Sequence, residues 1–201
     1  MKIKTVEELR KLYNKPSGRT ILKELNELEE HSENFINTSP FVMVGSHSNS
    51  GDIEVSPRGG KPGFVKIIDK NKIVIPDSKG NNRLDSLTNI IETGKIGLLF
   101  LIPGIDETLR VNGSAYLSTN KAHLELFLEE ENKPNVVVIV TIYKLFMHCA
   151  KALMRSKLWS EESIVNRSEF PSMGQILKDQ IGGEISFESH EDMVRRHTPD
   201  L

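Results

Sequence analysis

The chain has 201 residues, of which 37% are hydrophobic and 27% charged, and its formal net charge is −2. This balance predicts one globular domain, or two small ones, and excludes a nucleic-acid or membrane surface built on overall charge. The single cysteine excludes an intramolecular disulfide framework and a cysteine-rich metal site. The charged N-terminus lacks the apolar core of a signal peptide, and no apolar run approaches the ~20 residues of a membrane span, so we expect a soluble, cytoplasmic protein.

Helical patterns come first in chain order. We predict two helices, at residues 5–13 and 16–36, because apolar residues recur in both segments at helical spacing. A Pro-containing segment, 37–40, then marks a boundary. We therefore predict an N-terminal helical extension over residues 1–38. The apolar positions of its second helix are Ile21, Leu22, Leu25 and Leu28.

The middle of the chain is rich in short apolar runs separated by Gly, Asn, Asp and Pro, which is the pattern of strands. Their connections are too short to hold crossover helices, which predicts antiparallel pairing. The last run is almost continuously apolar, so we expect it to be buried on both faces. About six strands with a few helices predict an α+β, mainly β protein built on a barrel or sandwich. The runs are residues 41–46, 52–57, 64–68, 72–76, 95–103, 107–118 and 135–146.

Three more helices are predicted, at residues 83–94, 121–132 and 148–159. The first should end at Gly94, a usual helix stop. The last forty residues are mixed in pattern, and we predict for residues 161–201 a helical or irregular extension packed on the barrel. The apolar side of the first helix consists of Leu84, Leu87, Ile90 and Ile91.

The polar stretch 76–87 lies between a predicted strand and a predicted helix. A helix N-terminus offers unpaired N–H groups and a positive dipole end, both of which attract phosphate. Here a glycine lets the backbone approach closely, and a lysine and an arginine add charge; the planar fork of arginine suits phosphate. An anion site and an ordinary loop with an asparagine as helix cap both stay open. The residues concerned are Lys79, Gly80, Asn81, Asn82 and Arg83.

A second basic cluster lies just upstream and consists of Arg58, Lys61 and Lys66. By strand alternation Lys66 shares a face with Phe64 and Ile68, which predicts a partly buried cation with an anionic partner. A lysine that snorkels from an edge strand is the other interpretation. Because the two clusters are only one hairpin apart, they make a shared anion site more credible than either cluster does alone.

The segments SPRGGKPGFVKIID, KIVIPDSKGNNRLDSL, KIGLLFLIPG and ETLRVNGSAYL follow one another in this order. With them the chain resembles, over residues 41–159, the FMN-binding split-barrel flavoproteins related to pyridoxamine 5'-phosphate oxidase, and within them a bacterial subgroup. Several motifs in one order are more specific than a lone glycine pattern. The resemblance implies a six-stranded antiparallel split β-barrel over residues 39–160, a homodimer, and one FMN in each of two clefts at the subunit interface.

The resemblance also implies which residues bind the cofactor. The family's strand lysine matches Lys66, its upstream arginine falls at Lys61 or Arg58, and its ring-lining and phosphate-binding segments match residues 75–77 and 81–83. The expected FMN-binding residues of one subunit are Arg58, Lys61, Lys66, Ile75, Pro76, Asp77, Lys79, Asn81, Asn82 and Arg83. The partner subunit is expected to add Lys151, Arg155 and Trp159.

One departure from the family limits what the resemblance implies about the substrate. Pyridoxamine 5'-phosphate oxidases end in a strand whose Arg-x-His pair handles the substrate. Here Arg195, Arg196 and His197 lie in a polar tail without that pattern, so we do not infer pyridoxamine phosphate oxidation. The six histidines show no metal-ligand spacing, and we expect no metal site. No catalytic residue is identified.

The leading hypothesis is therefore an FMN-dependent oxidoreductase of unknown substrate and electron donor. A flavin-binding module without turnover, such as a sensor, is the alternative. A third hypothesis, a cysteine-dependent phosphatase, rests on His148, Cys149 and Arg155, which match the signature of that class. The five residues between Cys149 and Arg155 contain no glycine and form helices readily, which favours a plain helix with Cys149 packed as a small apolar side chain.

Overall fold

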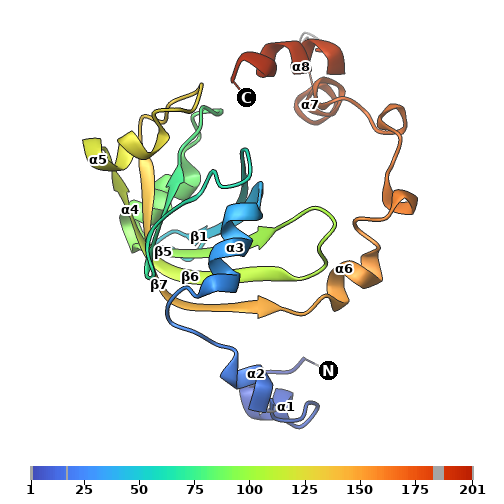
Figure 1. Ribbon diagram of the computed structural model, residues 1–201. Helices are drawn as coiled ribbons and strands as arrows, with labels where there is room; N and C mark the ends of the chain where they lie inside the picture. The colour runs from blue at the N-terminus through green and yellow to red at the C-terminus, as the bar shows by residue number, and fades with distance from the viewer. Residues whose placement is uncertain (1, 17, 183–187, 201) are drawn as a thin grey trace.

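The computed structural model describes residues 2–16, 18–182 and 188–200, and its centre is one antiparallel sheet (Figure 1). Neighbouring strands follow the order β2-β1-β5-β6-β7-β4-β3. This arrangement confirms the predicted α+β, mainly β class with antiparallel pairing, although the sheet has seven strands in place of six. The strands are β1 (Phe41–His47), β2 (Ile53–Gly59), β3 (Lys66–Asp69), β4 (Lys72–Pro76), β5 (Lys95–Leu101), β6 (Thr108–Ser118) and β7 (Val137–His148).

The helices flank this sheet and extend beyond it at both ends of the chain (Figure 1). Before the sheet come α1 (Val6–Arg10), α2 (Gly18–Leu22) and α3 (Glu30–Thr38). Between strands lie α4 (Asp85–Thr93), α5 (Lys121–Leu124) and the 3-10 turn η1 (Glu125–Phe127). After the sheet come α6 (Lys151–Ser156), η2 (Glu161–Ser163), η3 (Arg167–Glu169), α7 (Met173–Ile181), α8 (His190–His197) and η4 (Thr198–Asp200).

Residues 137–140 of β7 are buried on both faces, as the apolar run predicts, whereas Tyr143 in the second half of the strand is 52% exposed. Val138, Val140 and Ile142 point into the main hydrophobic core, whereas Val137 and Ile139 pack in a second, smaller cluster on the other face. Both faces are thus covered because successive residues of a strand alternate in direction and all of these residues are apolar. β7 pairs with β6 on one side and β4 on the other, so it connects the two halves of the sheet.

The pairing of β6 with β7 shifts register at Asn112 and Gly113. A Cβ atom at Gly113 would lie 2.6 Å from Val140 Cγ1 and 2.8 Å from the Thr141 carbonyl oxygen, so only glycine allows the two strands to approach this closely. Such a bulge bends the strand and increases its twist. The bulge therefore contributes to the curvature of the sheet.

The prediction of one helix over residues 16–36 is wrong. The chain around Leu25 is extended instead and pairs with β7: Leu25 N–H donates to the Leu145 carbonyl at 2.9 Å, and Leu145 N–H donates back at 2.8 Å. Leu28, which is 1% exposed, enters the core, and its N–H donates to the Lys70 carbonyl. These long-range contacts outweigh the local helical preference of the segment. A new helix, α3, then starts at a capping box formed by Glu29 and Ser32.

Helix α4 ends where the sequence predicts. Gly94 adopts a left-handed conformation (φ 62°), and its N–H donates to the Ile90 carbonyl at 2.9 Å. Leu87 and Ile90 are buried, but Leu84 and Ile91 are 53% and 73% exposed, so the buried face of this helix is narrower than predicted.

After β7 the chain leaves the sheet, and α8 brings its end back toward the loops at one end of the sheet (Figure 1). The helices from α6 to α8 contain no buried residue among those described. The predicted division into an extension, a barrel and a second extension packed on the barrel stays a prediction. In the part of the chain that the structure describes, every helix is too short or too polar to cross a membrane.

Candidate functional site

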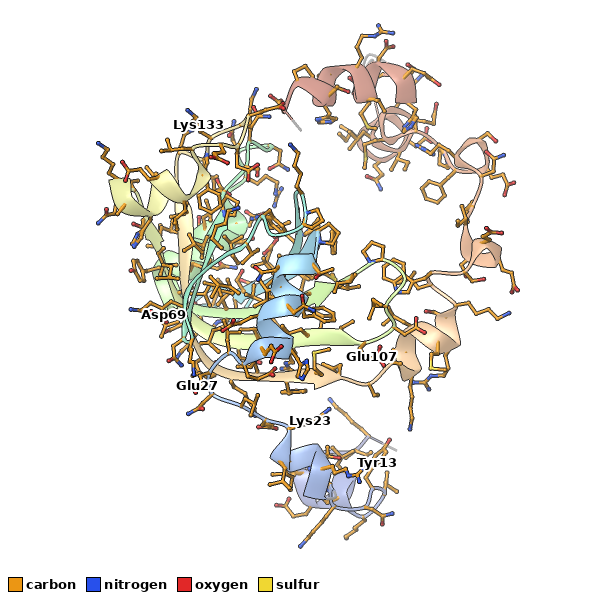
Figure 2. The ribbon with its side chains drawn as sticks, in the orientation of Figure 1. Tyr13, Lys23, Glu27, Asp69, Glu107 and Lys133 are labelled. Carbon is orange, nitrogen blue, oxygen red and sulfur yellow. The ribbon has the colours of Figure 1, made fainter. Side chains whose placement is uncertain are left out.

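A cleft of about 820 Å³ lies between β2, the loop that joins β4 to α4, and the loop before β7, and it is the candidate site. Figure 2 shows Lys133 on this last loop, at the end of the molecule where the C-terminal helices return. The lining residues come from three parts of the chain that lie far apart in sequence. They are residues 54, 56–59 and 64, residues 76–87, and residues 131–133 and 135.

Of the ten cofactor-binding residues predicted from one subunit, the structure brings seven into this cleft and leaves three outside its lining. The predicted residues that line it are Arg58, Pro76, Asp77, Lys79, Asn81, Asn82 and Arg83. Of the other three, Ile75 is 2% exposed and belongs to the main core. Lys61 lies on the surface after β2. Lys66 pairs with Glu130 (Nζ to Oε1, 3.7 Å), so its expected anionic partner is a carboxylate of the same chain.

A network of hydrogen bonds joins β2 to the first turn of α4 at the floor of the cleft. Arg58 Nη1 donates to Ser56 Oγ at 2.9 Å, and the Ser56 and Ser86 hydroxyls are also 2.9 Å apart. Ser86 Oγ, which is nearly inaccessible to solvent, donates to Glu54 Oε2 at 2.8 Å. Each of these groups is hydrogen-bonded to the next one, and this network fixes the position of the half-buried Arg58 guanidinium.

The sequence analysis missed Glu54, Ser56 and Ser86 as site residues. A signal for the first two was present, because residues two apart in a strand share a face, and Glu54 and Ser56 therefore lie on the face of Arg58. No comparable signal marks Ser86, which reaches the site only through the packing of α4 against β2.

The entrance of α4 is shaped by two left-handed residues, Asn82 and Leu84, both with φ of 60°. Arg83 lies between them; its N–H donates to Asn81 Oδ1 at 3.1 Å, and its Nε donates to Asp85 Oδ2 at 2.8 Å. The residue at the N-cap position is Leu84, with no side-chain hydrogen bond, so the interpretation of an asparagine as the cap is wrong. The first N–H groups of α4 therefore face the loop without a side-chain acceptor from the cap residue.

Positive and negative side chains are equally represented around the cleft. Exposed ion pairs within it, such as Arg83 with Asp85, are weak in water and can exchange partners. An anion would therefore be selected by the position of individual cations rather than by an overall positive field. The cations are Arg58, Lys79, Arg83 and Lys133, and the carboxylates are Glu54, Asp77, Asp85 and Glu131.

Asp77 is a partly buried carboxylate in the lining of the cleft. Its N–H donates to the Val136 carbonyl at 3.0 Å, which holds the residue at the end of β4. Burial raises the pKa of Asp77 above its ordinary value, and the positive charge of Arg58 opposes this effect only in part.

The three residues expected from a partner subunit lie outside this cleft in their own chain. Lys151 and Arg155 are exposed on α6, and Arg155 Nε donates to the Lys151 carbonyl at 3.1 Å. Trp159 Nε1 donates to the Ile105 carbonyl at 2.9 Å, which attaches the end of this segment to the connection between β5 and β6. Within one subunit these side chains thus do not contribute to the cleft.

The structure does not provide the phosphate cradle that the phosphatase hypothesis requires. Cys149 is exposed directly after β7, but the following residues form helix α6. The Met154 N–H, for example, donates to the Ala150 carbonyl at 3.0 Å. Backbone N–H groups used in helical hydrogen bonds cannot point together at a phosphate on the cysteine sulfur. Among the described residues, no group of three or more His, Cys, Asp or Glu side chains could hold a metal ion.

The raised pKa of Asp77 predicts how the ligand-free protein responds to pH. Since the folded-state pKa lies above the unfolded value, ionisation of Asp77 lowers the free energy of unfolding as pH rises between these two values. Asp77→Asn should therefore stabilise the protein at pH 7, and the gain should shrink as pH falls toward the ordinary aspartate pKa. Urea unfolding at several pH values measures this difference. Glu107→Gln, which changes an exposed carboxylate far from the cleft, is the control, and an equal gain in both variants would contradict the prediction.

Comparison with known proteins assigns the chain to a family. Its structure resembles that of HupZ from Group A Streptococcus, with a TM-score of 0.51 and 18% identity, over 60% of this chain and 93% of that chain; this likeness shows a shared fold. A Clostridium acetobutylicum protein related to general stress protein 26, of the pyridoxinephosphate oxidase family, has a TM-score of 0.45 and 14% identity, over 59% and 85% of the two chains. No curated protein sequence matches. The family model described as pyridoxamine 5'-phosphate oxidase matches residues 28–149, well over half of the chain, and the chain therefore belongs to this family.

Proposed function

We propose that the chain binds FMN in the cleft described above. The observation that carries this proposal is the convergence of Arg58 from β2 with Lys79 and Arg83 from the loop before α4 around one space of about 820 Å³. Small-molecule sites typically enclose about 300–1,000 Å³. Membership in the pyridoxamine 5'-phosphate oxidase family supports a flavin as the occupant.

The phosphate of FMN would lie at the loop before α4. Arg83 uses its Nε–H on Asp85 and carries four further N–H groups on its terminal nitrogens. The N–H groups of the first turn of α4 add donors and the positive end of the helix dipole. Asn81 and Asn82 can donate through their side-chain amides. Lys66 would join this group by exchanging Glu130 for the cofactor, and the exposed Lys61 by a change of rotamer.

The isoalloxazine ring would lie against the less polar wall of the same cleft. Pro57, Phe64, Pro76 and Leu87 line it, and Ile75 packs behind this wall in the main core. An apolar slot with a few polar groups is the usual environment of a flat, mostly aromatic ligand. Asp77, at the junction of the apolar wall and the polar loop, would be within reach of the ring or ribityl chain.

We further propose that the protein is an FMN-dependent oxidoreductase and a homodimer. Bound FMN supplies reversible electron transfer, while the chain holds the phosphate and shields the ring. The exposed α6 would reach the cleft of the other copy, so that Lys151, Arg155 and Trp159 of the partner subunit complete the site. Light scattering would then give about twice the 22.7 kDa mass of one chain, and a monomer mass would refute this arrangement.

FMN binding is testable by titration. The protein should bind one FMN per chain and show a flavin absorption band near about 450 nm. Arg83→Ala should weaken binding by about 2 kcal/mol, roughly 30-fold, because charge-assisted hydrogen bonds to the phosphate are lost. Arg10→Ala, on α1 and away from the cleft, removes the same charge and should bind like the unchanged protein. A protein that does not bind added FMN would refute the proposed cofactor. Equal FMN affinities of the two variants would show that Arg83 is not part of the site.

Turnover is tested separately from binding. The FMN-loaded protein should exchange electrons with a nicotinamide dinucleotide or a small electrophile faster than free FMN does, as followed by the flavin absorbance. Rates equal to those of free FMN with every such reactant would favour a flavin-binding module without turnover.

A further inference from the structure

The end of the chain returns to the rim of the cleft. Asp200 Oδ1 lies 2.7 Å from Lys79 Nζ, and Asn132 Nδ2 donates a long hydrogen bond of 3.5 Å to the Pro199 carbonyl. Lys79 and Asn132 both line the cleft and belong to two different loops of its rim. Figure 1 shows the described end of the chain, after α8, beside these loops. We name residues 198–200, the 3-10 turn η4, the C-terminal clasp.

The helices before the clasp form a unit of their own. The Arg196 guanidinium donates to both carboxylate oxygens of Glu188, at 2.8 and 2.9 Å, and Ser172 Oγ donates to the Glu188 carbonyl at 3.4 Å. These bonds connect α8 to the start of α7. Neither helix contains a buried residue among those described, so little apolar burial opposes a movement of the pair.

We propose that the clasp competes with the ligand for Lys79. In the ligand-free protein Asp200 forms an ion pair with Lys79, and the anionic end of the ligand displaces Asp200. The inference rests on the proposed function in so far as the anion is the phosphate of FMN. The Lys79 side chain is 73% exposed and that of Asp200 is 32% exposed. Ion pairs this exposed are weak, so a doubly charged phosphate can replace the carboxylate.

The carboxylate and the phosphate exclude each other for an electrostatic reason. Asp200 is in direct contact with Lys79 Nζ, so a phosphate on the same ammonium group would lie within a few ångströms of a second negative charge. Like charges at such a distance repel, and because Lys79 is exposed, salt weakens this repulsion. Closing of the clasp and binding of the anion are therefore alternatives, and the ligand-free state is held closed by the chain's own C-terminal end.

The first test compares Asp200→Asn with the unchanged protein in an FMN titration at low ionic strength. Removal of the competing charge should tighten FMN binding about two- to fivefold, the range expected for an exposed ion pair. Glu191→Gln removes one charge from α8, the helix before the clasp, and Glu191 does not pair with Lys79, so the FMN affinity of this variant should be unchanged. The gain of Asp200→Asn should shrink in high salt, which screens exposed charges. Equal FMN affinities of Asp200→Asn and the unchanged protein would overturn the clasp while leaving FMN binding intact.

The second test needs no ligand and therefore separates the clasp from the proposed cofactor. Backbone amides of α8 should exchange hydrogen with solvent faster in Asp200→Asn than in the unchanged protein, because the turn that follows the helix is released from Lys79. Equal exchange rates in Asp200→Asn and the unchanged protein would refute the contact that the proposal requires, even if FMN does not bind at all.

Discussion

The pairing of β7 with β4 and β6 is the constraint on which the rest of the structure depends. Because the first half of β7 is apolar on both faces, it is covered on both sides, and its pairing fixes the positions of β4 and β6. At its beginning the ladder pairs Pro76 with Val137, and Asp77 is held to Val136 just beyond. The loop that follows β4 therefore leaves the sheet at a defined point, where it faces β2 across the cleft.

The other wall of the cleft depends on polar contacts. The chain of hydrogen bonds through Arg58, Ser56, Ser86 and Glu54 joins β2 to α4. Buried polar groups are stable only when they are satisfied, so this network fixes the floor of the site. The rim, in contrast, consists of exposed ion pairs that can be exchanged for a ligand, and the C-terminal clasp is one of them.

Much of the fold and part of the site could be predicted from the sequence. Strand alternation and the apolar run of β7 are local patterns, as is the glycine that ends α4, and the structure has each of them. The segment 16–36 could not be predicted in this way, since the partners of Leu25 and Leu28 lie more than forty residues away, at Leu145 and Lys70. The same holds for Ser86, whose place in the site depends on how α4 packs against β2.

Lys66 and Lys79 show that the local sequence does not determine the partner of a charged side chain. The sequence by itself determined that Lys66 is a cation on a partly apolar strand, because alternation is a local property, and it left open an anionic partner or a snorkelling side chain. Only the tertiary structure decided that this partner is Glu130. Likewise, the sequence determined that Lys79 lies in a polar loop before a helix, and only the tertiary structure brought Asp200 to it. The physical reason is the same in both cases: charge and periodicity belong to a segment, whereas an ion pair between distant segments exists only after the sheet and helices have packed and brought those segments together.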